Sequence, residues 1–114
     1  MDAFAFYVNG QGFAGTGRTF GGSPTFYNDF YQYDSTANAW TAKANFGGTI
    51  REGVGAFVIG NNGYAGTGSI NNFTTQYTDF YKYNPVANTW TTVATFIGTQ
   101  RTNAATFAVG GFGY

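Results

Sequence analysis

The sequence predicts an all-β fold with two four-stranded antiparallel sheets and an additional ninth strand. The first observation is composition: 114 residues include 13 Phe, 9 Tyr and 18 Gly. Aromatic residues and Thr favour strands, whereas Gly and Asn favour turns. The second is an internal repeat of about 50 residues. The third is a series of short apolar or alternating runs separated by turn residues, a spacing that predicts an antiparallel meander.

The repeat is clearest when residues 29–51 are aligned with residues 79–101 at an offset of 50. Both segments begin with Asp-Phe-Tyr, share an Asn-x-Trp-Thr stretch and end in Arg. A second phrase, GFAGTG at 12–17, returns as GYAGTG at 63–68, at an offset of 51. The change in offset falls between the glycine phrase and the Asp-Phe-Tyr segment, where residues 18–28 correspond to 69–78, and it predicts a surface loop there, since such loops tolerate insertions.

Four strands are expected in the second repeat, at 54–59, 64–68, 77–83 and 89–94. The first run is apolar on both faces, as in a strand covered on both sides. Gly and Asn at 60–63 favour a tight turn, and Pro85 between two Asn residues favours another. The polar stretch 69–76 is expected to be a loop. Within it, Asn72 begins an Asn-Phe-Thr sequon, which matters only in a eukaryotic secretory route.

The first repeat gives equivalent strands at 3–8, 13–17, 27–33 and 39–44, and the ninth strand is expected at 104–109. Residues 101–114 therefore begin a third unit that stops before its glycine phrase. A single unit cannot bury both faces of its sheet, and repeat proteins gain stability by stacking neighbours. Three explanations remain open: a segment of a longer array, self-assembly of several copies, or another β-stack such as a fibre subunit.

Composition excludes several classes of function. The net charge is zero and only 9% of residues are charged, so the basic surface of a nucleic-acid-binding protein is missing. No apolar run is long enough to span a membrane. His and Cys are absent, which removes the commonest general base and metal ligands. We therefore expect no catalytic residues, no metal and no cofactor. Low charge with many Thr and Asn residues favours an extracellular or cell-surface location.

The order of a glycine-rich strand, an FYxY strand, a turn and a Trp resembles the kelch repeat, in the bacterial type of the galactose-oxidase-like β-propeller group. The resemblance implies that 1–50 and 51–100 are kelch-like propeller blades and that 101–114 is the first strand of a third, incomplete blade. One departure is that Gly-Thr-Gly replaces the adjacent kelch glycines. The resemblance assigns repeat positions to Gly15, Gly17, Gly66, Gly68, Tyr33, Tyr83, Trp40, Trp90, Arg51 and Arg101.

The repeated positions are best explained by packing. Trp40 and Trp90 are expected to join neighbouring blades, with each indole N–H bonded to backbone. Arg51 and Arg101 are expected to donate to carbonyls or to an Asp of the next blade. A sharper hypothesis makes these four residues ligand contacts. The glycine phrases do not fit phosphate loops, because those loops open a helix and nothing here predicts one.

The function expected from these observations is a non-enzymatic repeat module for protein interaction or structural self-assembly, as part of a larger or oligomeric propeller. One alternative is a carbohydrate-binding propeller module, since aromatic faces with Asn, Asp and Thr suit sugars. Another is a fragment of a galactose-oxidase-like enzyme whose catalytic residues lie elsewhere. The expected partners are neighbouring blades or further copies, with a glycan as the alternative.

Overall fold

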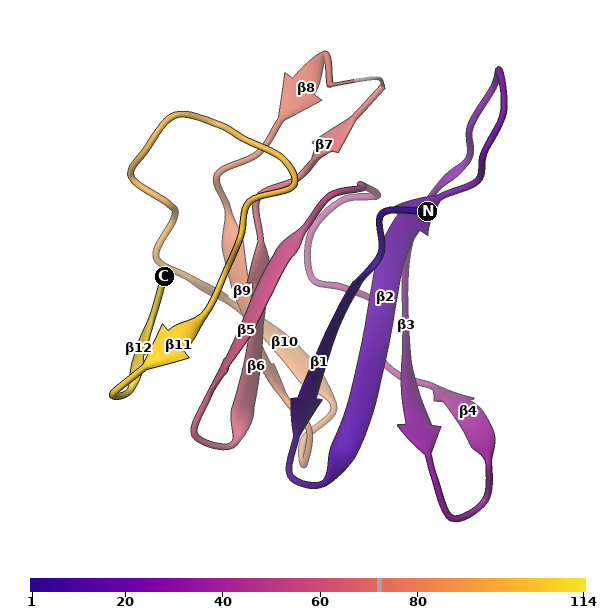
Figure 1. The fold of residues 1–114 in the computed structure, drawn as a ribbon, viewed down its shortest axis with the longest axis vertical. Helices are drawn as coiled ribbons and strands as arrows, with labels where there is room; N and C mark the ends of the chain where they lie inside the picture. The colour runs from indigo at the N-terminus through magenta and orange to yellow at the C-terminus, as the bar shows by residue number, and fades with distance from the viewer. Residues whose placement is uncertain (72) are drawn as a thin grey trace.

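The structure, a computed structural model, describes residues 1–71 and 73–114 and contains two four-stranded antiparallel sheets (Figure 1). Sheet 1 has the order β1-β2-β3-β4 and sheet 2 the order β5-β6-β9-β10. No helix occurs within these two described ranges, so the all-β prediction is confirmed. The strands are β1 Phe4–Val8, β2 Gln11–Arg18, β3 Phe26–Asp34, β4 Ala39–Ala42, β5 Gly55–Ile59, β6 Asn62–Gly66, β9 Phe80–Asn84 and β10 Thr89–Val93.

Two short hairpins differ from the sequence prediction. The expected loop at 69–76 contains the hairpin β7 (Ser69–Ile70) and β8 (Thr75–Gln76), while Asn72 of the sequon lies outside the described residues. The expected ninth strand at 104–109 is reduced to β11 (Ala108–Val109), which pairs with β12 (Phe112–Gly113). Residues 107–114, here called the terminal hairpin, are closed by backbone hydrogen bonds between Phe107 and Tyr114.

The turns after the third strand of each sheet are built in the same way. The side-chain oxygen of Asp34 accepts hydrogen bonds from the backbone N–H groups of residues 36 and 37. Asn84 accepts the equivalent pair from residues 86 and 87. Asn38 and Asn88 then adopt positive φ, a conformation that Asn tolerates better than most residues. Short polar side chains therefore fix the register of the outer two strands in each sheet.

The glycine phrase allows the second and third strands to approach closely. A Cβ at Gly66 would collide with the carbonyl oxygen of Asp79 and with the ring of Phe80. Gly15 meets the equivalent atoms of Asp29 and Phe30 in sheet 1. The phrase thus serves strand packing. Among the described residues, no helix follows it, as a phosphate-binding loop would require.

The hydrophobic core lies between the two sheets and is mostly aromatic. In β1 the side chains alternate between buried and exposed, so that Phe4, Phe6 and Val8 face sheet 2. Phe13 and Phe30 lie on the same face of sheet 1. These rings meet Tyr83 and Ala65 of sheet 2, neither of which is exposed to solvent. Among the described residues, no helix is long and apolar enough to cross a membrane.

Residues 101–114 pack on sheet 2 as residues 51–64 pack on sheet 1. The N–H of Gly53 donates to the carbonyl of Asp2 at 3.0 Å, and the N–H of Asn103 donates to the carbonyl of Gly53 at 2.9 Å. Figure 1 shows the terminal hairpin as a partial third layer beside β5. The stack therefore consists of sheet 1, sheet 2 and the terminal hairpin.

Candidate functional site

The interface between the two sheets shows how one repeat unit of this chain packs on the next, because both packed faces are present in the structure. We define the phenylalanine face of sheet 1 as the face carrying Phe4, Phe6, Phe13 and Phe30, with Phe46 beside it. The tryptophan face of sheet 2 carries Ala56, Val58, Gly63, Ala65, Tyr81, Tyr83 and Trp90. Unlike faces therefore meet, which makes the contact heterologous, as in head-to-tail stacking.

Tyr83 and Trp90 fill the centre of this interface. The ring of Tyr83 stands edge-on to Phe30 at a centroid distance of 4.8 Å. Trp90 lies 5.1 Å from Phe30 and 5.2 Å from Phe46. Edge-to-face aromatic pairs at such distances contribute stability beyond the area that they bury. A Cβ at Gly63 would overlap the ring of Phe6, so the tryptophan face needs glycine at this point.

Two polar contacts fix the position of Trp90 against the chain that leaves sheet 1. Its indole Nε1–H donates to the carbonyl of Ala44 at 3.1 Å. The N–H of Ala44 donates to the side-chain oxygen of Asn88 at 2.9 Å, and the hydroxyl of Tyr83 donates to that same oxygen. These bonds satisfy the polar atoms of the interface.

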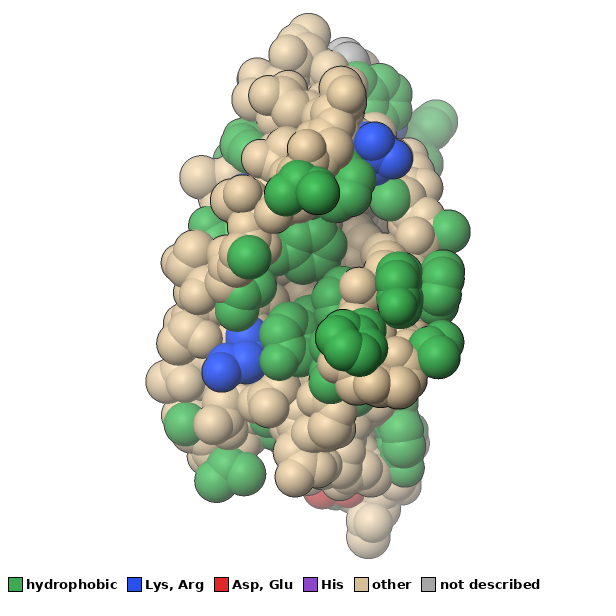
Figure 2. Space-filling view, turned by 90° about the vertical axis from the view of Figure 1, so that its left-hand side faces the viewer, with side chains coloured by type: hydrophobic (Ala, Val, Ile, Leu, Met, Phe, Trp, Pro, Cys, Tyr) green, Lys and Arg blue, Asp and Glu red, His purple; other side chains and the backbone are tan. Residues whose placement is uncertain are grey.

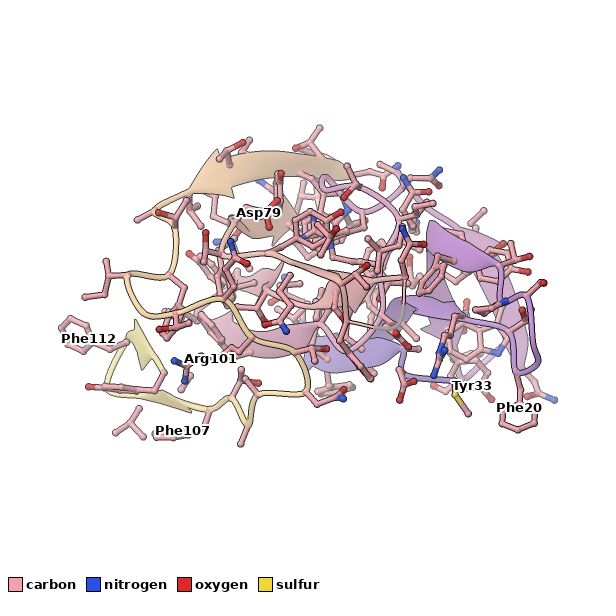
Figure 3. The ribbon with its side chains drawn as sticks, turned by 90° about the horizontal axis from the view of Figure 1, so that it is seen from above. Phe20, Tyr33, Asp79, Arg101, Phe107 and Phe112 are labelled. Carbon is pink, nitrogen blue, oxygen red and sulfur yellow. The ribbon has the colours of Figure 1, made fainter. Side chains whose placement is uncertain are left out.

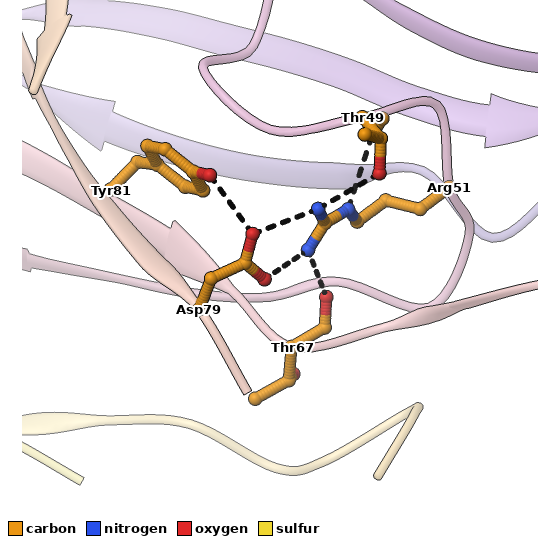
Figure 4. A network of polar contacts seen from close by, with 5 residues as sticks. All are labelled: Thr49, Arg51, Thr67, Asp79 and Tyr81. Atoms are coloured by element: carbon orange, nitrogen blue, oxygen red, sulfur yellow. Dashed lines mark hydrogen bonds and ion pairs between the residues drawn. The ribbon is translucent and has the colours of Figure 1, made fainter. Parts of the chain in front are cut away.

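Arg51 joins the segment between the two sheets to sheet 2 (Figure 4). Its side chain is fully buried, and its guanidinium donates to both carboxylate oxygens of Asp79, at 2.5 and 3.0 Å. It also donates to the backbone carbonyls of Thr49 and Thr67, both at 3.1 Å. The ring of Tyr77 lies 3.9 Å from its Cζ. The two-point geometry is one that Arg provides and Lys does not.

This environment shifts the pKa of two acidic groups. Burial alone would raise the pKa of Asp79, but the hydrogen bonds and charge of Arg51 outweigh it, so the pKa lies below its ordinary value. Tyr81 donates its hydroxyl to Asp79 at 2.9 Å. Burial, together with this bond to a carboxylate, raises the pKa of Tyr81. The bridge is therefore charged at neutral pH.

The tryptophan face of sheet 1 is exposed, in contrast to that of sheet 2. Trp40 is 58% exposed and Tyr7 is 70% exposed. Tyr33 packs against Trp40 at a centroid distance of 5.2 Å and donates its hydroxyl to Asn38, as Tyr83 does to Asn88. The expected packing of a tryptophan between sheets is thus seen for Trp90, whereas Trp40 lies on an open surface.

The phenylalanine face of sheet 2 is covered only in part. Its residues Phe57 and Phe80 lie beside the terminal hairpin, which is itself largely exposed. Figure 2 shows this side of the molecule, where hydrophobic side chains gather on the surface. In Figure 3, Arg101, Phe107 and Phe112 lie at one end of the stack and Tyr33 lies at the other. The two ends thus present opposite faces.

Arg101 has the local geometry of Arg51 without an acidic partner. Its Nε donates to the carbonyl of Thr99 at 3.1 Å, and its Cζ lies 4.6 Å from the ring centre of Phe96. Among the residues that the structure describes, neither Arg101 nor Asp29, the counterpart of Asp79, forms an ion pair. Each is half of a bridge whose complete form is Arg51–Asp79.

Sequence reasoning missed a polar cluster at the edge of the sheets. Glu52 is only 1% exposed and pairs with Arg18 at 2.5 Å between Oε2 and Nε. Burial raises the pKa of Glu52, and the charge of Arg18 opposes that shift. Glu52 is the only glutamate in the chain, but it is not repeated, so the repeat pattern gave no reason to select it. Within the described part of the chain, no group of acidic residues could hold a metal ion.

Comparisons with known proteins give a structural match but no family. No family model matches the sequence, and no curated protein matches it. Among solved structures, the chain resembles YjhT. The TM-score is 0.76 with 25% sequence identity, and the match covers 98% of this chain and 32% of YjhT. The chain therefore spans about a third of the length of that protein.

Proposed function

We propose that this chain is a non-enzymatic, kelch-like repeat module that acts by stacking its exposed sheet faces on further units of the same kind. On this proposal residues 1–50 and 51–100 are two propeller blades, and 101–114 starts a third. One observation carries the proposal: the Trp and the two Tyr residues of the face that is buried in sheet 2 return at the same sheet positions on the open surface of sheet 1.

The internal interface supplies the reason for stacking. Trp40, Tyr33 and Tyr31 occupy the sheet positions of Trp90, Tyr83 and Tyr81. The phenylalanine face of sheet 2 from another copy could cover them in the register already seen inside the chain, once the terminal hairpin of that copy moves aside. An exposed, contiguous aromatic surface of this kind is typical of interaction sites. The match to one third of YjhT supports the idea that such units are joined in larger arrays.

The absence of enzymatic activity is part of the proposal. An active site needs different groups in different roles, whereas the repeated residues of this chain are the same in both units. Those that lie between the sheets are used in packing and in one structural ion pair. The chain has no His or Cys that could serve a copper-radical site.

The proposal is tested by the fluorescence of Trp40 in a Trp90→Phe variant, which leaves one indole as the reporter. If the tryptophan face of sheet 1 becomes covered, the emission shifts to shorter wavelength and acrylamide quenching falls as the protein concentration rises. Unchanged emission and quenching over the whole concentration range would contradict stacking on this face. A Trp40→Phe variant, which keeps only the half-buried Trp90, is the matched control.

The exposure of Trp40 beside Tyr33 also favours one alternative, carbohydrate recognition. An aromatic platform of this kind can stack on a sugar ring. A glycan array read with the wild-type chain and a folded Trp40→Ala variant separates the two functions. Glycan binding that is lost in the variant supports recognition of sugars, and no binding to any glycan counts against it.

A further inference from the structure

A cavity of about 330 Å³ lies between sheet 2 and the terminal hairpin. Its walls include Phe57, Tyr64, Phe80, Ala94, Phe96 and Gly113. The apolar lining and the rings on several sides make it suitable for one or two large aromatic side chains.

Each wall of this cavity has a counterpart around Tyr83 and Trp90 in the internal interface. The ring of Phe57 covers Gly113 as the ring of Phe6 covers Gly63. Ala94 follows β10 where Ala44 follows β4, the residue that bonds Trp90 and Asn88. The remaining counterparts are Phe13 for Tyr64, Phe30 for Phe80 and Phe46 for Phe96. The cavity therefore occupies the place that Tyr83 and Trp90 fill one layer earlier.

Charge complementarity gives the same orientation. In the internal interface Arg51 binds Asp79, which directly precedes β9 with its residues Tyr81 and Tyr83. Arg101 stands at the equivalent point beside the cavity, held by Thr99 and Phe96, and it lines a second hollow together with Phe96 and Tyr114. An inserted strand that carries Asp before its tyrosines would complete the bridge.

The terminal hairpin also offers a free strand edge. In sheet 2, β6 pairs with β5 on one side and with β9 on the other. In the described part of the chain, β12 pairs only with β11. Its second edge stands where a strand equivalent to β9 would continue the layer, an arrangement suited to β-strand addition.

The cavity, the Arg101 side chain and the free edge of β12 together form a groove beside the terminal hairpin. We propose that this groove binds a β-hairpin of the kind formed by residues 79–90, with the pattern Asp-Phe-Tyr-x-Tyr followed by Asn-x-Trp. Its Asp pairs with Arg101, its second Tyr and its Trp enter the cavity, and its Asn and indole N–H bond the backbone of Ala94. This inference rests on the proposed stacking function and names the partner at one end of the stack.

A complete second copy is a different occupant and is not the one proposed. In the internal register β5 and β6 lie on sheet 1, and the terminal hairpin holds that same place on sheet 2. A second copy could dock its sheet 1 there only after the terminal hairpin moved away. A hairpin without the two preceding strands fits beside the terminal hairpin as it stands.

The direct test is a titration of the full chain with a fluorescein-labelled peptide of residues 77–94, followed by anisotropy. We expect saturable binding of one peptide per chain. Replacement of the peptide's Trp90 by Ala weakens binding about tenfold or more, because the cavity then stays empty. Arg101→Met in the chain weakens binding of the wild-type peptide but not of the Asp79→Asn peptide, since the pair is already broken. Equal affinity of the wild-type and Trp90→Ala peptides would overturn the inference.

A covalent version covers the case in which the free peptide binds too weakly to detect. Because Tyr114 corresponds to Tyr64, a copy of residues 65–94 can be added after Tyr114 without a break in the repeat. The extended chain is expected to unfold at a higher urea concentration than the same extension with its copy of Trp90 replaced by Ala. Identical midpoints, together with no peptide binding, would overturn the inference.

The two proposals fail in different ways. If the peptide does not bind while Trp40 still becomes covered at high protein concentration, the proposed hairpin-binding groove is wrong and the proposed stacking on sheet 1 stands. If the peptide binds while Trp40 stays exposed at every protein concentration, the proposed association of copies is wrong and the proposed hairpin-binding groove stands. A second copy as the occupant would show as peptide-independent association that increases when the terminal hairpin is loosened by Thr106→Ala, since Thr106 bonds both polar backbone groups of Ala56.

Discussion

Arg51 holds both carboxylate oxygens of Asp79, although the two residues are 28 positions apart in the chain. Arg51 belongs to the segment that leaves sheet 1, and Asp79 directly precedes β9 of sheet 2. The ion pair therefore fixes the segment between the two sheets against sheet 2. The same chain contains Arg101 and Asp29, which repeat the two halves without joining them. This contrast provides matched variants in one molecule.

Arg51→Met is expected to lower the free energy of unfolding by about 2–3 kcal/mol, because it leaves Asp79 partly buried without its cation. The exposed part of the Asp79 side chain, 27%, keeps the cost below that of a fully buried charge. Arg101→Met, which removes an exposed arginine without an acidic partner, is expected to change it by less than about 0.5 kcal/mol. Urea denaturation of both variants measures the difference, and equal effects would show that the Arg51 bridge is not structural.

The Arg51–Asp79 ion pair also predicts how the stability of the folded chain depends on pH. The pKa of Asp79 in the folded chain lies below its ordinary value of 3.8. Its contribution to stability is therefore fully present above that value and is lost as the pH falls through the folded-state pKa. Glu52 acts in the opposite sense, because burial raises its pKa and favours the protonated form in the folded chain.

The measurement is the melting temperature of the wild type and of Asp79→Asn between about pH 2 and pH 7. The variant should melt lower at neutral pH and lose less stability on acidification. If both proteins lose the same stability in acid, Asp79 is not the group responsible.

The glycine phrase predicts a second stability difference. Gly66→Ala places a methyl group against the carbonyl of Asp79 and the ring of Phe80, so the two strands must separate. The expected loss is about 2–3 kcal/mol in the free energy of unfolding. Gly22→Ala is the control, since Gly22 has open space around its Cβ position and no positive φ. Thermal or urea unfolding of the pair measures the effect, and a neutral Gly66→Ala would show that close strand approach is not required.

The strand pattern of the two sheets could be predicted from the sequence because local signals agreed with the repeat. The turns at Asp34 and Asn84 and the alternation of Phe4, Phe6 and Val8 each fix a register without help from distant residues. The ninth strand was predicted too long for the opposite reason. Residues 104–106 continue the strand-like run, but a strand forms only where successive backbone groups have partners, and the backbone pairing of the terminal hairpin begins at Phe107.

For the interface between the two sheets, the sequence predicted the type of packing residue but not which copy of it would be buried. Repetition of Trp40 and Trp90 indicated packing groups, but it could not show that one would be enclosed and the other open. That difference arises because two units share a single interface. The Arg18–Glu52 pair was missed for another reason: neither charge is repeated, and their meeting depends on how the end of β2 packs against the segment before β5.

The central claim is that the open tryptophan face of sheet 1 is a stacking surface, and the mass of the chain in solution tests it most directly. Light scattering over a range of concentrations is expected to give masses above the 12.2 kDa of one chain, falling toward that value on dilution. Trp40→Ala should shift the distribution toward the single chain without loss of folding, because Trp40 lies outside the core. A wild-type mass of 12.2 kDa at every concentration, with sharp cooperative melting, would contradict the account.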